Sequence, residues 1–323
     1  RGEPPPRVIA HARVPARYAR YRKTMPMQER MAEMQFRLPR HRLAGKLPVH
    51  DPHETFEHEL VLGAGERQAR LLWAPSETDD ALAVWLPHAR VLYGGPAVID
   101  SIPNIGTPLR TMRDTLRWAD TLERLAALQP QLVVREFGPA IEGEAQVQDV
   151  LGRTARALRW LHEAVIGLMN QGLGEREILE RLDYPPELFD APWMRPTYGD
   201  PAYIARDIYR SENGWWDRNP TSLHPAPVEQ VGRAIANAIR DKAAVIDSAR
   251  EHARAGNFQL ALHVIDLLAT AHGEAPELRV ARLLKAGWLR ERARQVQSYV
   301  ARSLYHASAT LLEDDNASHF SIR

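Results

Sequence analysis

The stretch RLLWAPSETDDALAVWLPHARVLYGG, residues 70–95, decides the fold class of the first part of the chain. It contains three short apolar, β-prone runs at 70–73, 82–86 and 90–93, which are bounded by prolines and a glycine pair. Runs of this kind, separated by turn residues, predict neighbouring strands of one sheet.

The sequence after this stretch changes from mixed to helical. A helix is predicted at about 111–128 and a further buried strand at 132–134, an order that is typical of an α/β layer sandwich. From about residue 144, apolar residues recur at steps of three, four and seven, which places them on one helical face. Residues 254–268 resemble the turn and second helix of a tetratricopeptide-type pair. We predict two parts: an α/β part, residues 1–143, and an all-α part, residues 144–323.

Composition limits the class of protein. The chain has 323 residues, of which 44% are hydrophobic and 26% are charged, as in ordinary globular proteins. No apolar run approaches the roughly 20 residues that a membrane-spanning helix needs, so we expect no membrane span. Cysteine is absent, which excludes disulfides, thiolate metal ligands and a cysteine nucleophile. The compartment stays open between the cytoplasm, which we favour, and the periplasm or the outside of the cell.

The first fifty residues are basic, with 12 Lys or Arg against 3 Asp or Glu, although the net charge of the whole chain is only +1. A basic segment of this kind can mark a nucleic-acid surface. Here the arginines are interleaved with proline and apolar residues and do not form one run. We therefore expect a solvated face and no nucleic-acid partner.

Short motifs follow one another in the second half of the chain. They are MNQGL at 169–173, YPP at 184–186, YG at 198–199, NGWWDRNP at 213–220 and LHP at 223–225. Each alone is typical of a helix end, a turn or an aromatic core. In this order, they resemble the dimerisation domain of the alkyl sulfatases, which belong to the metallo-β-lactamase superfamily.

The resemblance implies a fold, an assembly and an activity. Residues 1–143 would form the C-terminal part of the αββα sandwich of the metallo-β-lactamases, and residues 144–323 a helical dimerisation domain with a tetratricopeptide-like helix pair. The protein would be a homodimer. It would be a hydrolase that cleaves small-molecule sulfate esters of alkyl alcohols by a metal-bound water, with one or two zinc ions as cofactor.

Two glutamates match metal-binding positions of the family. Glu77 lies in the loop before the predicted strand at 82–86, where alkyl sulfatases have a metal-binding glutamate, and a carboxylate suits Zn²⁺. Glu136 stands at the place of the family's last metal-binding histidine. It either substitutes as a ligand or pairs with Arg135 or Arg153, in which case the ligand is lost.

Three further residues match sulfate-binding positions. Asn104 matches the family's asparagine, and Arg110 matches its arginine after a shift of one residue. An amide donor and a guanidinium fork suit the oxygens of a sulfate group. Tyr203 stands where the family often has a histidine that faces the sulfate. A phenol can donate a hydrogen bond there, but it cannot shuttle a proton near neutral pH.

The chain departs from the family pattern in two places. The motif His-x-His-x-Asp-His does not occur in it, and the resemblance of residues 8–11 to the strand after that motif implies that the motif lies upstream. The histidines and acids at 50–54 have the wrong spacing to replace it. Pro96 stands where the family has a carboxylate that bridges the metals, and it has no ligand atom to offer; Asp100 is the nearest substitute.

These departures keep two other classes of protein open. One is a dimeric scaffold of the same fold with no activity or an altered one. The other is a nuclease-like relative that uses the basic N-terminal segment, for which we would expect salt-dependent binding of nucleic acid.

Overall fold

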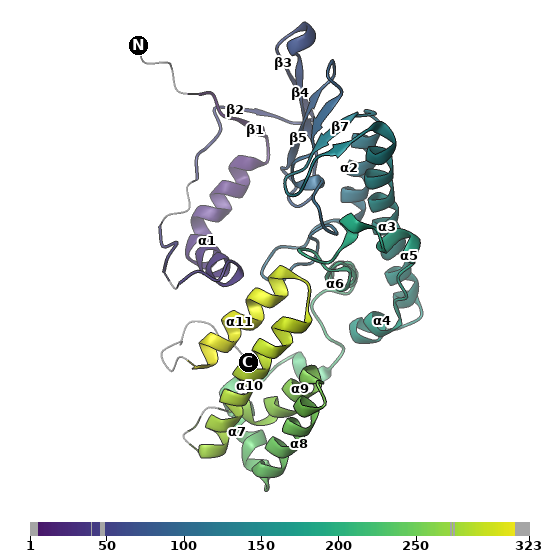
Figure 1. Ribbon diagram of the computed structural model, residues 1–323. Coiled ribbons are helices and arrows are strands. Elements are labelled where there is room, and N and C mark those ends of the chain that lie inside the picture. The colour runs from purple at the N-terminus through teal and green to yellow at the C-terminus, as the bar shows by residue number, and fades with distance from the viewer. Residues whose placement is uncertain (1–5, 40, 46–48, 272, 274, 314–323) are drawn as a thin grey trace. The chain divides into compact units, whose positions relative to one another are not determined.

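The computed structural model describes residues 6–39, 41–45, 49–271, 273 and 275–313 (Figure 1). The chain forms two compact units. The first comprises the chain up to Glu29 together with Ala44–Asp217, and the second comprises Arg30–Leu43 together with the chain from Arg218 onward. Each unit is described separately.

A six-stranded sheet is the centre of the first unit, with the strands in the order β3-β4-β5-β6-β7-β8. All neighbouring strands are antiparallel except β6 and β7, which are parallel. The three runs predicted as strands form β4, β5 and β6, so this prediction is confirmed. The strands are β3 (Glu59–Leu62), β4 (Ala69–Trp73), β5 (Leu82–Leu86), β6 (Val91–Tyr93), β7 (Leu132–Val134) and β8 (Ile141–Glu142).

A second, smaller sheet pairs β1 (Ile9–His11) with β2 (Glu54–Phe56) in parallel. The helix α1 (Val14–Gln35) follows β1. The parallel pair brings the start of the chain to the segment that precedes the main sheet.

The predicted crossover helix between β6 and β7 is α2 (Thr115–Ala126). It begins later than the sequence predicts, because Asp114 caps its first turn by accepting a hydrogen bond from the Arg117 amide. The residues before Asp114 remain in a loop, which leaves their backbone and side chains available for other contacts.

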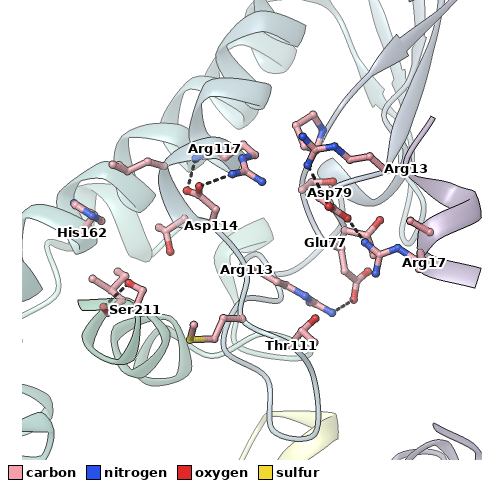
Figure 2. A pocket seen from close by; sticks show the side chains of 18 of the residues that line it. Arg13, Arg17, Glu77, Asp79, Thr111, Arg113, Asp114, Arg117, His162 and Ser211 are labelled. Atoms are coloured by element: carbon pink, nitrogen blue, oxygen red, sulfur yellow. Dashed lines mark hydrogen bonds and ion pairs between the residues drawn. The ribbon is translucent and has the colours of Figure 1, made fainter. Parts of the chain in front are cut away.

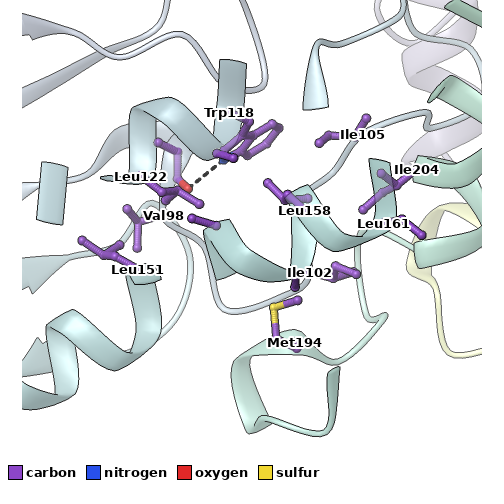
Figure 3. Packing of buried hydrophobic residues seen from close by; sticks show 14 of the residues in the cluster. Val98, Ile102, Ile105, Trp118, Leu122, Leu151, Leu158, Leu161, Met194 and Ile204 are labelled. Carbon is purple, nitrogen blue, oxygen red and sulfur yellow. Dashed lines mark hydrogen bonds between the residues drawn. The ribbon is translucent and has the colours of Figure 1, made fainter. Parts of the chain in front are cut away.

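The core of the first unit lies between the main sheet and the helices α2 and α3 (Glu144–Asn170), and Figure 3 shows the part of it that α2 and α3 contribute. Trp118 of α2 is fully buried, and its indole N–H donates to the carbonyl of Ala97 over 3.1 Å. Leu158 and Leu161 of α3 belong to the same cluster, as the helical periodicity of this segment predicts.

Three further helices of the first unit follow α3: α4 (Glu175–Arg181), α5 (Pro186–Phe189) and α6 (Pro201–Asn213). Helical structure begins at Glu144, but α3 to α6 belong to the same compact unit as the sheet. The change of secondary structure therefore lies inside one packed unit, and the domain boundary at residue 143 stays a prediction.

The second unit is helical. Its helices are α7 (Val228–Ala238), α8 (Lys242–Arg254), α9 (Phe258–Ala269), α10 (Pro276–Gln295) and α11 (Tyr299–Glu313). The Asn257 side chain caps α9 by accepting from the Leu260 amide, and α8 packs on α9, which confirms the predicted helix pair. Within the described part of the chain, no helix is long and apolar enough to cross a membrane.

Candidate functional site

The loop between β4 and β5 presents Glu77. A hydrogen bond from the Ala74 amide to the Ala81 carbonyl, 2.9 Å long, closes the loop at its base, and the Ser76 amide donates to the Thr78 carbonyl over 3.0 Å. The Glu77 side chain leaves this turn and accepts a 3.0 Å hydrogen bond from the side-chain amide of Asn104. The structure therefore brings together two residues that the resemblance assigns to different roles.

Asn104 lies in an irregular segment, residues 101–114, which we call the site loop. Asn104 is 1% exposed, and its side-chain oxygen accepts a hydrogen bond from the Thr107 hydroxyl. The loop is fastened further back as well, because the Ser101 hydroxyl donates to the Arg195 carbonyl over 3.0 Å. With its oxygen and one N–H of its nitrogen engaged in this way, the Asn104 side-chain amide has a fixed orientation.

Gly106 allows the site loop to lie directly against α6. Its φ is +67°, and a Cβ atom at this position would stand 1.9 Å from the carbonyl oxygen of Tyr203. Only glycine can adopt this backbone conformation so close to another chain segment. Tyr203, in the first turn of α6, therefore lies against the site loop with its backbone carbonyl.

Arg113 completes this cluster, although sequence reasoning did not single it out. One guanidinium nitrogen lies 2.9 Å from Oε1 of Glu77, and another donates to the carbonyl of Asn104. The backbone amide of Arg113 donates to the Asp207 carboxylate of α6 over 2.8 Å. The pair Arg113-Asp114 directly before the helix start is the signal that could have drawn attention to this position.

Glu136 follows β7 and lies near Glu77. Its backbone amide donates to the Val98 carbonyl over 3.2 Å. Burial raises the pKa of the Glu136 carboxyl, and the negative charge of Glu77 raises it further. Arg135 pairs with Asp100, and Arg153 pairs with Asp149, so neither arginine neutralises Glu136.

Arg110 lies close to the same cluster. Burial lowers the pKa of its guanidinium, and the positive charge of Arg113 lowers it further, while Tyr198 and Glu77 act in the opposite direction. Its Nη1 donates to the carbonyl of Leu109 over 3.2 Å. The predicted residues Glu77, Asn104, Arg110 and Glu136 therefore lie in one region of the first unit.

A cavity of about 880 Å³ opens beside Glu77 and Arg113 (Figure 2). Charged side chains make up much of its wall. On one side, Arg13, which directly precedes α1, and Arg17 of α1 pair with Asp79, which ties the start of α1 to the Glu77 loop. The tryptophans and tyrosines of residues 192–227 are not among the residues that line it.

The chemistry of the donor set fits a metal ion only in part. Glu77 and Glu136 are two carboxylates close enough to repel, and a divalent cation between them would relieve that repulsion. Among the described residues, no group of three or more His, Asp or Glu is arranged to hold a metal. Asp100 is held by Arg135, and Pro96 lies in a short turn at Gly95–Ala97.

Comparison with known proteins agrees with the resemblance of the motifs. Residues 174–315 match a family model described as alkyl sulfatase dimerisation. The linear primary-alkylsulfatase of Pseudomonas sp. (strain ATCC 19151) is 29% identical over 213 residues, which are 65% of this chain and 40% of that protein. The chain is therefore similar to the alkyl sulfatases. The alkyl/aryl-sulfatase BDS1 of Saccharomyces cerevisiae is 23% identical over 238 residues, or 72% of this chain and 36% of that protein.

Solved structures confirm the fold of this alkyl sulfatase-like chain. The stereoselective inverting sec-alkylsulfatase Pisa1 from Pseudomonas sp. superposes with a TM-score of 0.83 at 19% identity, over 98% of this chain and 53% of that one. A double mutant of PisA1 gives the same TM-score at 20% identity, over 95% of this chain and 51% of that one. The alkyl sulfatase-like chain thus spans about half of these structures and less than half of the curated relatives.

Proposed function

We propose that this chain contributes part of the active site of a sulfate ester hydrolase that acts on alkyl sulfates. The observation that carries the proposal is the buried contact of Glu77 with Asn104 and Arg113, next to Glu136. The names of the relatives support the reaction class, since both curated relatives are sulfatases.

In this proposal, Asn104 and Arg110 bind the sulfate group. A sulfate ester presents several oxygens that accept hydrogen bonds, and an amide with a guanidinium supplies donors in fixed directions. The hydrogen bonds of the Asn104 side chain with Glu77 and Thr107 support this role, because donors that are held in place lose little freedom when the substrate binds. Tyr203 is proposed as a further donor from the start of α6.

Glu77 and Glu136 would hold zinc, together with ligands from outside the described residues. When bound, zinc supplies Lewis-acid polarisation and lowers the pKa of water, which is the chemistry that sulfate ester hydrolysis needs at neutral pH. The ion pair with Arg113 holds one carboxylate oxygen of Glu77 in place. Burial and the negative charge of Glu77 raise the pKa of Glu136, and a bound cation would act against this shift.

The experiment is a measurement of inorganic sulfate released from a primary alkyl sulfate by the protein as it is naturally made. We expect release with the wild type and a loss of about a hundredfold or more in Glu77→Gln, since a metal ligand is removed. Glu59→Gln is the matched control, because Glu59 is also paired with an arginine, Arg70, but on β3 and β4 and not with a residue of the cluster. Absence of sulfate release with zinc supplied would contradict the proposal and favour the non-catalytic scaffold.

We also propose that the protein is a homodimer. The family model described as dimerisation covers α4 to α11 and supports this assembly. Exposed apolar side chains occur within the same range, namely Trp215, Leu223, Val231 and Ile235. In α7, the small residues Gly232 and Ala236 face inward, which leaves the larger Val231 and Ile235 at the surface. Sedimentation velocity would give the mass of a dimer, whereas a monomer at every concentration would contradict the proposal.

A further inference from the structure

A continuous set of contacts leads from α6 to Glu77. Asp207 of α6 is buried, and its carboxylate accepts hydrogen bonds from the backbone amides of Arg113 and Gly106. Gly106 and Arg113 lie near the two ends of the part of the site loop that follows Asn104. The site loop is therefore anchored to α6 at two points by one carboxylate.

The guanidinium of Arg113 connects the site loop to the loop that carries Glu77. Its side chain is only 7% exposed, and two of its nitrogens are engaged, one by the Glu77 carboxylate and one by the Asn104 carbonyl. A planar guanidinium that binds two groups at once fixes both of them relative to each other, which a lysine ammonium does less well. Arg113 thus joins the loop after β4 to the site loop.

The contacts distinguish the two oxygens of Glu77. Oε1 receives both the Asn104 amide at 3.0 Å and the Arg113 guanidinium at 2.9 Å. Oε2 has no partner among the described residues. Two donors on one oxygen set the rotation of the carboxylate, so that Oε2 is the oxygen left for a ligand from outside the chain.

We propose that Arg113, anchored by Asp207, is a positioning residue that sets the orientation of the Glu77 carboxylate and of Asn104. This inference rests on the proposed function only for its consequence, the binding of metal and sulfate ester. The arrangement itself is a property of this chain. In this arrangement α6, which lies in the matched dimerisation region, also fixes the position of the site loop through Asp207.

The first test measures the Asn104 side-chain amide by nuclear magnetic resonance in the metal-free protein. We expect Arg113→Met to shift the Asn104 Nδ2 signals and to raise their hydrogen exchange rate by about tenfold, since Glu77 is no longer held in place to accept from them. Arg113→Lys is expected to restore part of the protection. Arg159→Met is the matched control: the Arg159 guanidinium also binds two groups at once, the carboxylates of Asp120 and Glu123, and neither belongs to the cluster.

The second test is a double-mutant cycle on the zinc affinity of the protein as it is naturally made, measured by competition with a chelating dye. We expect Arg113→Met to weaken zinc binding by about tenfold in the wild-type background, as is typical when a group that orients a metal ligand is removed. In the Glu77→Gln background the same change should have less than about a twofold effect, because Arg113 acts through Glu77. Asp207→Asn should show the same dependence on Glu77 with a smaller effect.

The outcomes separate the two proposals. Unchanged Asn104 signals in a folded Arg113→Met protein would overturn the positioning role, and so would additive effects on zinc affinity. A wild-type protein that binds no zinc and releases no sulfate would overturn the proposed function instead. In that case the Asn104 measurement still decides whether Arg113 positions the cluster.

Discussion

The site loop, residues 101–114, and the aromatic segment at residues 214–227 are both irregular and both rich in proline and glycine, yet their surroundings are opposite. In the site loop, Ile102, Asn104 and Ile105 are almost completely buried, and the polar groups are hydrogen bonded to α6 and to the loop after β4. In the aromatic segment, Trp215 is 73% exposed, and Leu223 is exposed as well.

This difference teaches that irregular backbone can be either the most or the least constrained part of a chain. Buried backbone requires a partner for each polar group, and α6 supplies such partners for the site loop through Asp207. The aromatic segment has large apolar side chains at the surface, which is typical of a surface that binds another molecule. The first segment is built to hold charges in place, and the second is proposed to contact a partner.

The largest expected effect is a difference in the free energy of unfolding between variants of two tryptophans, one buried and one exposed. Trp118 lies fully buried next to the site loop, so Trp118→Ala should reduce the free energy of unfolding by about 3–5 kcal/mol. Trp215→Ala should change it by no more than about 0.5 kcal/mol, because the side chain is already in water. Urea unfolding of both variants gives the comparison. Equal losses in the two would show that the aromatic segment is packed.

Two glycines give the next comparison. Gly106→Ala should reduce the free energy of unfolding by about 3 kcal/mol or more, since the new Cβ meets the Tyr203 carbonyl and the backbone has a φ of +67°. Gly214 also has a positive φ of +73°, but nothing lies within 4 Å of a Cβ there, so Gly214→Ala should cost about 1–2 kcal/mol from the backbone alone. Thermal unfolding measures both. A smaller cost at Gly106 than at Gly214 would mean that the loop does not lie against α6.

Trp215 should have its main effect on assembly. If the aromatic segment contacts a second copy, Trp215→Ala weakens the dimer by about tenfold while the fold stays intact, as is typical of a tryptophan near the centre of an interface. Sedimentation velocity over a range of concentrations gives the dissociation constant. Tyr93→Ala is a control, because Tyr93 is also an exposed aromatic residue but lies on β6, outside the matched dimerisation region. The same weakening in both variants would argue against a specific contact at Trp215.

The smallest effect concerns Glu136. Its pKa is raised in the folded state by burial and by Glu77, so the stability it contributes is present below its ordinary pKa near 4.5 and is lost as the pH rises through the folded value. Metal-free Glu136→Gln should therefore be slightly more stable than wild type near neutral pH, by less than about 1 kcal/mol because the group is partly exposed. The difference should vanish toward about pH 4. A variant that is less stable at neutral pH would show that the Glu136 charge is favourable in the fold.

Much of the fold could be predicted from local patterns. The runs that form β4 to β6 are short and bounded by turn residues, and the apolar face of α3 repeats with the period of a helix. Each of these signals depends only on residues that are close together in the sequence. The start of α2 was predicted too early. Asp114 caps the helix while Arg113 bonds to Asp207, and the second of these contacts spans 94 residues of sequence.

The site could be predicted only through the resemblance. Glu77, Asn104 and Glu136 came from the order of family motifs, and the structure places them together, but their roles stay predictions. Arg113 was missed because its importance depends on three partners from distant segments, Glu77, Asn104 and Asp207. The requirement for Gly106 depends in the same way on how closely α6 approaches the loop.

Elemental analysis of zinc per protomer tests the central claim most directly. The measurement compares this chain with a longer form that carries a His-x-His-x-Asp-His segment before residue 1, with and without Glu77→Gln. The account predicts about one or two zinc ions per protomer in the longer form, clearly less in its Glu77→Gln variant, and little in this chain alone. No zinc in the longer form, or the same zinc content after Glu77→Gln, would contradict it.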